Sequence, residues 1–460
     1  MPAHIFDYEL FGDQFSAPEL RQIFDEASML QTWLDIEAAL AEAEAAVGLI
    51  PASAAAEIRS KAKLELLDLG AVKRGLAETV HPLVPLIREL ARVAGPAGEY
   101  VHWGATTQDI LDTGLVLQLK AAYRVFRGDL VALIECLADL AQRHRDTVMA
   151  GRTHGQHALP ITFGFKVAVW VAECLRHRER LDQSAPRVLV GQLAGAVGTL
   201  AGFGARAREV QQFTLERLGL GVPPVAWHTA RDSVAEFVGL AGLIGATLGK
   251  MANEVMVLQR TEMAEVEEPF THGKVGSSTM PHKRNPAHSE RVVAISRLLR
   301  QPAAAALDAM VQLNERDTSA SRTDWFLVPE SACLLGAALR WSLHIFRGLT
   351  VRPDRMAKNL DLLGGMLCSE AVMLRLGETL GRQTAHDVVY EAAMAAYEKD
   401  LSFRELLLGD PRVAGRLGPE QLDRLLEPDR YLGQAREFVD EVVARAKRRM
   451  SGSDPERGPA

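Results

Sequence analysis

Cysteine is scarce in this sequence, with four residues among 460. The four are far apart, and each lies in an apolar, helix-like context: Cys136, Cys174, Cys333 and Cys368. Disulfide frameworks and metal sites are typified by short, recurring cysteine spacings, which this sequence lacks. We therefore expect buried free thiols.

An excess of positive charge and long hydrophobic runs are also missing. Lys and Arg total 52 against 59 Asp and Glu, a net charge of −7, which argues against nucleic acid or an anionic membrane as the main partner. Apolar stretches such as 237–248 are shorter than the ~18 residues that span a bilayer. The N-terminus has neither the basic nor the apolar region of a secretory signal. We expect a cytoplasmic protein.

Aromatic residues are few, at 6%, although hydrophobic residues make up 48% of the chain. The excess of Ala and Leu favours helices. Apolar residues recur at helical spacing over five long runs: 109–149, 161–184, 232–268, 286–314 and 329–346. No segment alternates well enough to predict a strand, so the predicted fold class is all-α.

The long runs carry apolar residues on more than one face, and such helices must be surrounded by other helices. We expect a central bundle of long antiparallel helices over 109–352. Smaller helical domains are predicted at 1–108 and 353–450, and a disordered tail at 451–460. The apolar faces also predict a homo-oligomer.

Four polar segments rich in Gly, Ser and Thr lie beside the long runs: 100–109, 151–160, 191–199 and 276–286. Capping of helix ends is the simpler interpretation, but loops on a rigid scaffold often carry function. Loops at opposite ends of antiparallel helices cannot all meet within one subunit. They can meet across an oligomer interface, which predicts a composite site built from several chains.

The residue types in these segments suit a carboxylate ligand. Hydroxyls and N–H groups at helix N-termini, with Lys283, Asn285, Thr106 and Thr107, would bind carboxylates. Histidine exchanges protons near neutral pH, and a serine facing positive charge would act as a base. No set of metal ligands is patterned in the sequence, so no metal is expected.

Residues 276–286, GSSTMPHKRNP, resemble the signature loop of the fumarase/aspartase superfamily, which includes adenylosuccinate lyase and 3-carboxy-cis,cis-muconate cycloisomerase. The resemblance extends from 15–24 to 431–439, with the loop placed at 271–286. It implies a homotetramer with a central core of about twenty helices and sites shared by three subunits. It implies no metal or organic cofactor.

The superfamily reaction is a β-elimination through an aci-carboxylate, and the resemblance assigns roles to this chain's residues. Ser278 would be the base, His154 the general acid, and His81 a second catalytic histidine. The residues implied or considered for substrate binding are Ser277, Lys283, Asn285, Thr106, Thr107, Thr153, Gln156, Arg231 and Arg316. For Arg231 and Arg316, ion pairs between helices are an equally open interpretation.

The branch of the superfamily is less clear from the motifs. Residues 101–109, 112–119 and 227–232 resemble the cycloisomerase, whereas His154 in the 151–157 segment resembles adenylosuccinate lyase. Adenylosuccinate lyases grip a phosphate with a second arginine where this chain has Trp325. This substitution favours a smaller substrate without a phosphate.

The sequence therefore predicts a lyase that cleaves a C–N bond in a small substituted succinate and releases fumarate. The alternative is 3-carboxy-cis,cis-muconate cycloisomerase of aromatic catabolism. Adenylosuccinate lyase and a catalytically silent structural homologue are less favoured. The leaving group and the stereochemistry are not specified by these residues.

Overall fold

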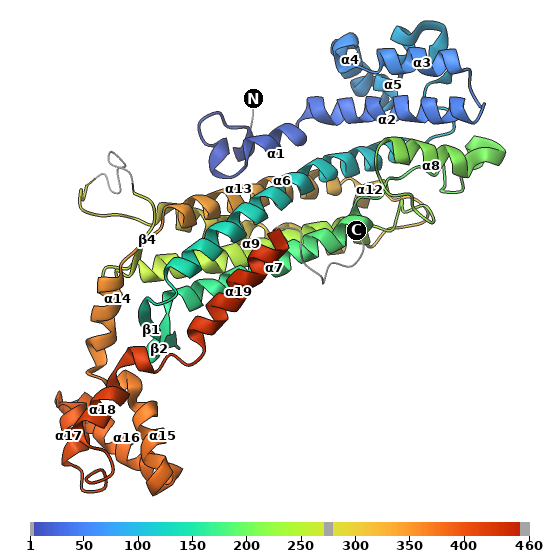
Figure 1. Ribbon diagram of the computed structural model, residues 1–460. Coiled ribbons are helices and arrows are strands. Elements are labelled where there is room, and N and C mark those ends of the chain that lie inside the picture. The colour runs from blue at the N-terminus through green and yellow to red at the C-terminus, as the bar shows by residue number, and fades with distance from the viewer. Residues whose placement is uncertain (1–3, 271–278, 451–460) are drawn as a thin grey trace. The chain divides into compact units, whose positions relative to one another are not determined.

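Helices make up most of the regular structure in the computed structural model, which describes residues 4–270 and 279–450 (Figure 1). The N-terminal helices are α1 (Pro18–Ile23), α2 (Glu26–Ala46), α3 (Ala52–Lys61), α4 (Leu69–Thr79) and α5 (Val84–Ala94). The C-terminal helices are α14 (Pro353–Leu360), α15 (Ser369–Leu380), α16 (Arg382–Lys399), α17 (Phe403–Gly409), α18 (Pro419–Leu426) and α19 (Ala435–Met450). The predicted all-α class is confirmed, while the tail predicted at 451–460 lies outside the described residues.

The middle of the chain contains the long helices, with shorter helices between them. The long ones are α6 (Thr107–Arg143), α7 (Phe163–Val188), α9 (Asp232–Leu258) and α13 (Asp324–Arg347). The shorter ones are α8 (Ala207–Arg217), α10 (Ala287–Leu298), α11 (Arg300–Asp308) and α12 (Thr318–Ser321). Four of the five predicted runs therefore correspond to single long helices with shifted ends.

The fifth run, 286–314, is not one helix, which corrects the prediction. It divides at Leu299 into α10 and α11. Pro302 lies in the first turn of α11, where its missing N–H costs nothing, whereas in a continuous helix Pro302 would leave the Leu298 carbonyl without its donor. The apolar spacing of the two helices was predicted correctly, but the prediction of one helix did not take Pro302 into account.

A β-hairpin lies between α6 and α7, which corrects the expectation that no strand is present. Strands β1 (Val148–Thr153) and β2 (Gln156–Thr162) pair antiparallel, with a register shift between Ala150 and Arg152. The two residues of the turn, His154 and Gly155, have φ angles of 52° and 78°. Positive φ at both positions is the geometry of a two-residue type I′ turn. His154 therefore stands at the tip of a hairpin.

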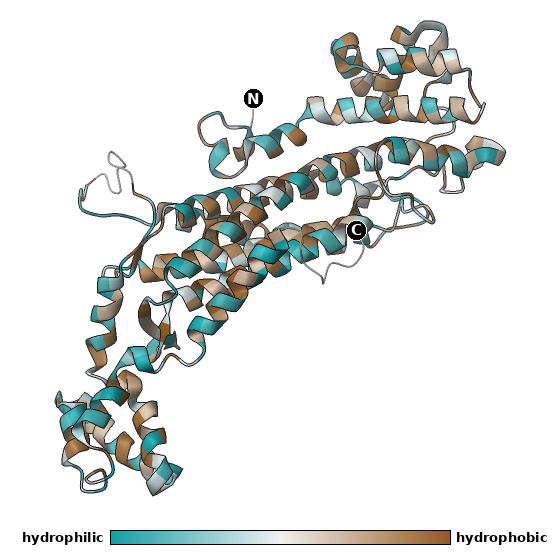
Figure 2. Cartoon of the chain, viewed as in Figure 1, coloured by the Kyte–Doolittle hydropathy of each residue, from teal (hydrophilic) through white to brown (hydrophobic). Residues whose placement is uncertain are grey.

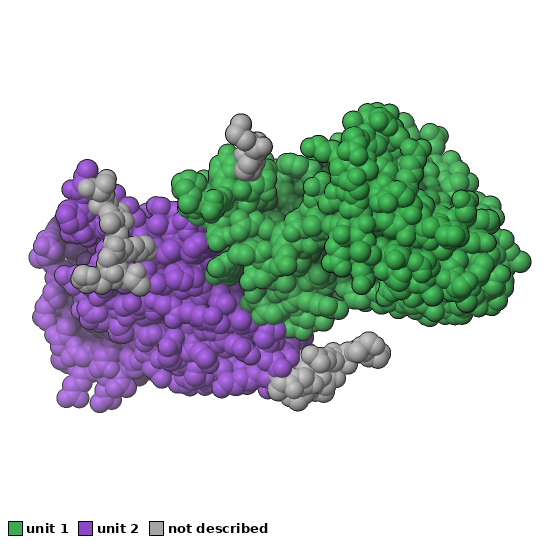
Figure 3. Space-filling view, turned by 90° about the horizontal axis from the view of Figure 1, so that it is seen from above, with its two compact units in different colours: residues 1–129, 177–249, 292–340 green, residues 130–176, 250–291, 341–460 purple. Residues whose placement is uncertain are grey.

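A second, smaller sheet joins β3 (Val266–Glu267) to β4 (Thr350–Val351). By their packing, the residues fall into two compact units (Figure 3). Unit 1 comprises residues 1–129, 177–249 and 292–340, and unit 2 comprises 130–176, 250–291 and 341–460. The three-part division predicted from the sequence is a different partition and stays a prediction.

The core of unit 1 combines aromatic packing with close helix contacts. Phe126 on α6 stacks on Phe237 of α9 at 6.2 Å between ring centroids. A Cβ atom on Gly245 of α9 would lie 2.4 Å from Leu299 Cδ1. Glycine at this position therefore allows α9 to approach the junction of α10 and α11.

The core of unit 2 includes the contact of Trp170 on α7 with Phe346 on α13, at 5.5 Å between centroids. Helix α19 shows alternating polar and apolar residues along its length (Figure 2). Its buried residues recur every three or four positions: Ala435, Val439, Val443 and Ala446. This spacing places one apolar face of α19 against the protein.

One helix in the described part of the chain is long and apolar enough to cross a membrane. This helix is α9, whose most apolar window has a mean hydropathy of 1.4. Within the protein 67% of that window is buried. We interpret α9 as a core helix, although its apolar run is longer than the sequence had suggested.

Candidate active site

A histidine and a threonine predicted for the site lie together in unit 1. His81 follows the left-handed Val80 that ends α4, and Thr107 begins α6. His81 Nδ1 accepts hydrogen bonds from the backbone N–H groups of Leu83 and Val84, at 3.3 and 3.1 Å. The proton of the neutral ring is therefore on Nε2, which lies 3.2 Å from Thr107 Oγ1 and donates to it.

The environment of His81 keeps its ring neutral. Burial and the nearby charge of His102 both lower the pKa of His81 from its ordinary value. With Nε2 donating to the Thr107 hydroxyl, that hydroxyl can donate its own proton to an acceptor such as a carboxylate oxygen. The pair is thus suited to binding an anion.

Asp109 connects three segments around this pair. Its buried carboxylate accepts from the backbone N–H groups of Thr106, Ala194 and Gly195 and from His228 Nε2, at 2.9 to 3.0 Å. Two of the predicted polar segments, 100–109 and 191–199, therefore meet in unit 1. The sequence had not singled out Asp109, although it lies two positions after Thr107.

His102 is packed next to the same segment. Its Nδ1 lies 2.7 Å from Oε1 of the buried Glu37. Burial alone would lower the pKa of His102, but the charge and hydrogen bond of Glu37, with the charge of Asp109, outweigh it and raise the pKa. The geometry favours a packed, ion-paired histidine over a substrate contact.

Arg231, for which the sequence left a substrate contact and an ion pair equally open, is ion-paired in the structure. Its side chain is 1% exposed and binds Asp112 with two nitrogens, at 2.8 and 3.1 Å. Nε also donates to Asp324 at 3.0 Å. Because these two buried carboxylates hold the guanidinium, Arg231 is not free to bind a substrate, and the ion-pair interpretation is correct.

Arg316 has a different environment. Its Nε donates to Gln108 Oε1 at 2.9 Å, whereas its Nη2 is buried and has no hydrogen-bond partner within residues 4–270 and 279–450. Gln108 is a residue that the sequence analysis missed. Its position next to Thr107 was the only signal available.

The hairpin residues of unit 2 are presented to the outside of the chain. The side chains of Thr153, His154 and Gln156 are exposed at the tip. The base of the hairpin is fixed, because Arg152 binds the buried Glu265 through two nitrogens at 2.6 and 3.0 Å. The tip is therefore a rigidly mounted group of polar side chains.

The described part of the signature loop also lies in unit 2. Lys283 is exposed and Asn285 is half-buried, just before α10. Glu268 anchors the start of α10 by accepting from the N–H groups of His288 and Ser289, at 3.1 and 3.0 Å. Ser277 and Ser278 lie outside the described residues.

Within the described residues no group of His, Cys, Asp and Glu has the arrangement of a metal site. The four cysteines are free, as predicted, and three of them are buried while Cys136 is half-buried. Burial raises the pKa of Cys174 and of Cys333 to about 12. Such thiols are poor nucleophiles at neutral pH.

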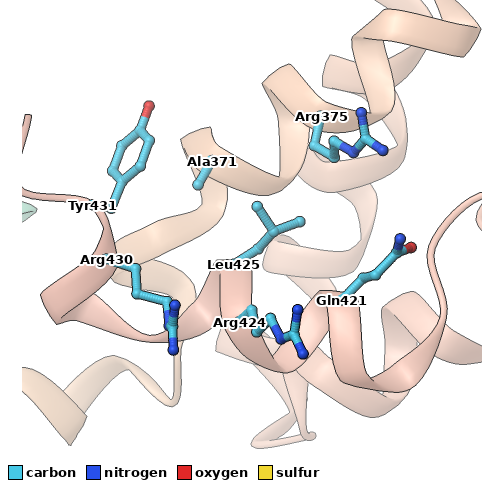
Figure 4. Close-up of a pocket in the computed structure, with 7 residues that line it drawn as sticks. All are labelled: Ala371, Arg375, Gln421, Arg424, Leu425, Arg430 and Tyr431. Atoms are coloured by element: carbon cyan, nitrogen blue, oxygen red, sulfur yellow. The ribbon is translucent and has the colours of Figure 1, made fainter.

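A cavity of about 310 Å³ lies at the C-terminal helices, lined by residues of α15, α18 and the turn after it (Figure 4). It contains Arg375, Arg424 and Arg430 but none of the predicted site residues. Arg375 and Arg430 are paired with glutamates three positions away. We do not assign the active site to this cavity.

Comparison with known proteins agrees with the helical fold. The family described as Lyase matches residues 13–299, and the family described as Adenylosuccinate lyase C-terminus matches 365–442. N-acetyl-S-(2-succino)cysteine lyase of Dickeya dadantii is 44% identical over 443 residues, covering 96% of this chain and 98% of that protein. 3-carboxy-cis,cis-muconate cycloisomerase of Pseudomonas aeruginosa is 42% identical, covering 95% and 96%.

A solved structure of fumarate lyase from Mesorhizobium sp. BNC1 is similar in fold, with a TM-score of 0.89 and 40% identity. It covers 95% of this chain and 99% of that one. The matches define a helical lyase. The chain belongs to the fumarase/aspartase superfamily.

Proposed function

We propose that this protein is a lyase that cleaves the C–S bond of an S-(2-succino) thioether and releases fumarate and a thiol. The preferred substrate is N-acetyl-S-(2-succino)cysteine, which the Dickeya dadantii relative is named for. The C–N bond predicted from the sequence gives way to C–S, because two of the relatives carry this thioether in their names. The elimination itself is unchanged.

The observation that carries the proposal is the guanidinium of Arg316, whose Nε donates to Gln108, the residue after Thr107. Arg316 has a buried Nη2 without a partner among the described residues, which suits one carboxylate on the leaving group. Trp325 stands where a second arginine would grip a phosphate, and its ring instead lies 6.1 Å from that of Trp33. A carboxylate therefore fits this side of the site better than a phosphate.

The reaction would proceed by loss of a proton next to a carboxylate, followed by departure of the thiol. Ser278 removes the proton, and Lys283 and Asn285 stabilise the aci-carboxylate. The electron pair then re-forms the carboxylate, the C=C bond of fumarate forms and the C–S bond breaks with its electrons on sulfur. His154 supplies the proton to the thiolate.

The second succinyl carboxylate is assigned to the hydroxyls of Thr106 and Thr107. His81 orients Thr107 through its Nε2 proton, which is the role that the 3.2 Å contact supports. Thr153, Gln156 and Ser277 complete the proposed binding set. No metal or organic cofactor takes part in this scheme.

We propose a homotetramer, located in the cytoplasm, in which different copies contribute these residues. Support comes from large apolar side chains that unit 1 leaves exposed: Leu307, Val311, Leu313 and Phe326 are 59–78% exposed. An apolar surface of this kind is usually covered by a partner. Light scattering after gel filtration tests it, since a monomer would overturn the shared site.

Cycloisomerisation of 3-carboxy-cis,cis-muconate is the second candidate. This candidate is favoured by the name of the Pseudomonas aeruginosa relative and by the sequence motifs at 101–109 and 227–232. Incubation of the protein with the thioether, with a succinyl amine and with carboxymuconate separates the candidates. Fumarate released from the thioether at the highest kcat/KM supports the proposal, and turnover of carboxymuconate alone overturns it.

A further inference from the structure

The amide of Gln108 has only one orientation that satisfies its surroundings. The side chain is buried, and its Nε2 lies 3.1 Å from Asp112 Oδ2 and 2.8 Å from the carbonyl oxygen of His228. Both partners are acceptors, so the amide nitrogen must face them. Oε1 must then face Arg316, whose Nε donates to it at 2.9 Å.

This orientation is held by the buried charges behind it. Asp112 Oδ2 accepts from Gln108 and also from Arg231 Nη1, at 2.8 Å. Arg231 is fixed in turn by Asp324. A flipped amide would bring its oxygen against the Asp112 carboxylate, so the ion-paired group makes the flip unfavourable. Arg231 thus acts on Gln108 indirectly, through the carboxylate of Asp112.

Gln108 also decides which edge of Arg316 remains without a hydrogen-bond partner in the described part of the chain. A guanidinium binds a carboxylate bidentately either through Nε and one terminal nitrogen or through both terminal nitrogens. Gln108 occupies Nε and so closes the first edge. Nη2 is buried without a partner among the described residues, and it belongs to the edge that is left.

We propose that Gln108 is a positioning residue that turns the Nη1/Nη2 edge of Arg316 toward the carboxylate of the leaving group. This inference rests on the proposed function. N-acetyl-S-(2-succino)cysteine has three carboxylates, and the two of the succinyl half are assigned to the threonines and to the signature loop. The third, on the departing cysteine, is left for Arg316.

The test replaces Gln108 by Met, which keeps the length of the side chain but cannot accept from Arg316. Two ligands are compared: N-acetyl-S-(2-succino)cysteine, and N-acetyl-S-(2-succino)cysteamine, which lacks the cysteine carboxylate. Binding is measured by calorimetry in a Ser278→Ala background, and KM and kcat in the otherwise unaltered protein. We expect Gln108→Met to weaken binding of the tricarboxylate ~10- to 100-fold, with a matching rise in KM. The cysteamine compound should bind within about twofold of its original affinity.

Two further variants make the result specific. Gln118→Met changes a glutamine on the same helix that is equally buried, but whose Nε2 donates to the Ile23 carbonyl at 2.7 Å. It should leave the affinities for both ligands unchanged. In an Arg316→Met background, Gln108→Met should cause no further loss for the tricarboxylate, because both changes remove the same interaction.

An equal loss for both ligands would overturn the proposal, since it would show that Gln108 supports the whole site rather than the edge of Arg316. Unchanged binding of the tricarboxylate by Gln108→Met would overturn it as well. If the unaltered protein neither binds nor cleaves the two thioethers, the proposed function itself fails and this inference falls with it. Failure of the inference and failure of the proposed function are therefore distinguishable, because only the second is seen in the unaltered protein.

Discussion

The network around Asp109 and Arg231 and the hairpin tip at His154 show two opposite ways of presenting polar groups. In the network the carboxylates and the guanidinium are buried and bonded to each other. At the tip the side chains are exposed on a turn whose base is fixed by Arg152 and Glu265. The first arrangement holds its charged groups in fixed positions, and the second leaves its side chains accessible, as the proposed shared site requires.

Removal of the Arg231 guanidinium should cause the largest effect, a loss of stability, because the buried network depends on it. Arg231→Met leaves Asp112 and Asp324 buried without their cation, which should lower the free energy of unfolding by about 3–5 kcal/mol. Urea unfolding followed by circular dichroism measures the change. A loss below about 1 kcal/mol would mean that the triad is not a structural support.

Lys283 should behave in the opposite way, because its side chain is exposed. Lys283→Gln removes the charge that the proposed mechanism places on the aci-carboxylate, so kcat should fall about 100- to 1,000-fold while the midpoint of unfolding stays unchanged. Steady-state kinetics of fumarate release and thermal unfolding test both halves. Full activity would remove Lys283 from the mechanism.

His154→Asn should reduce kcat less for a thiol than for an amine leaving group. A thiol has a pKa of about 8.5 and leaves without much help, so a loss of about 10- to 100-fold is expected, at or below the low end for a lost acid. The measurement is kcat for a succinyl thioether and a succinyl amine side by side. Equal losses for the two substrates would speak against His154 as the acid.

The two histidines near the network should respond to pH in opposite directions. The pKa of His81 is lowered by burial and by His102, so its contribution to stability is lost as the pH falls below the ordinary value of 6.5. The pKa of His102 is raised, because Glu37 outweighs burial, so its contribution is present below pH 6.5 and lost as the pH rises through the raised pKa. Unfolding midpoints are measured from pH 5 to 9 for the His81→Gln and His102→Gln variants. The His81→Gln variant should lack the fall in stability on the acid side, and the His102→Gln variant should lack the fall on the alkaline side. A single shared profile contradicts the assignment.

The smallest effect is expected for an ion pair outside the network. Arg187 pairs with Glu236 in unit 1, but its side chain is 58% exposed. Arg187→Met should change the free energy of unfolding by about 0–1 kcal/mol, because water screens an exposed pair. It serves as the matched control for Arg231→Met, and a comparable loss in both variants would erase the distinction between buried and exposed pairs.

Much of the fold could be predicted because its signals are local. The apolar spacing that marks α6, α7, α9 and α13 is present in each segment by itself. Errors arose where one residue overrode the pattern, as Pro302 does between α10 and α11. The hairpin was missed because β1 is buried at three consecutive residues, Met149 to Gly151, and does not alternate.

The candidate site could be predicted only as a set of residue types. The motifs at 100–109 and 276–286 selected Thr107 and Lys283 and specified a carboxylate substrate. They could not separate Arg231 from Arg316, because both are arginines in polar surroundings along the chain. Gln108 gave no signal of its own.

The sequence by itself therefore determined the helical class and the superfamily, since helical periodicity and a long motif are properties of neighbouring residues. The tertiary structure decided which charged groups are available. Gln108 and Arg316 are 208 positions apart, and Arg231 meets Asp112 across 119 positions. A guanidinium can be neutralised by buried carboxylates, or it can keep an edge that has no hydrogen-bond partner. Which of the two occurs depends on contacts between distant segments, which only the folded chain brings together.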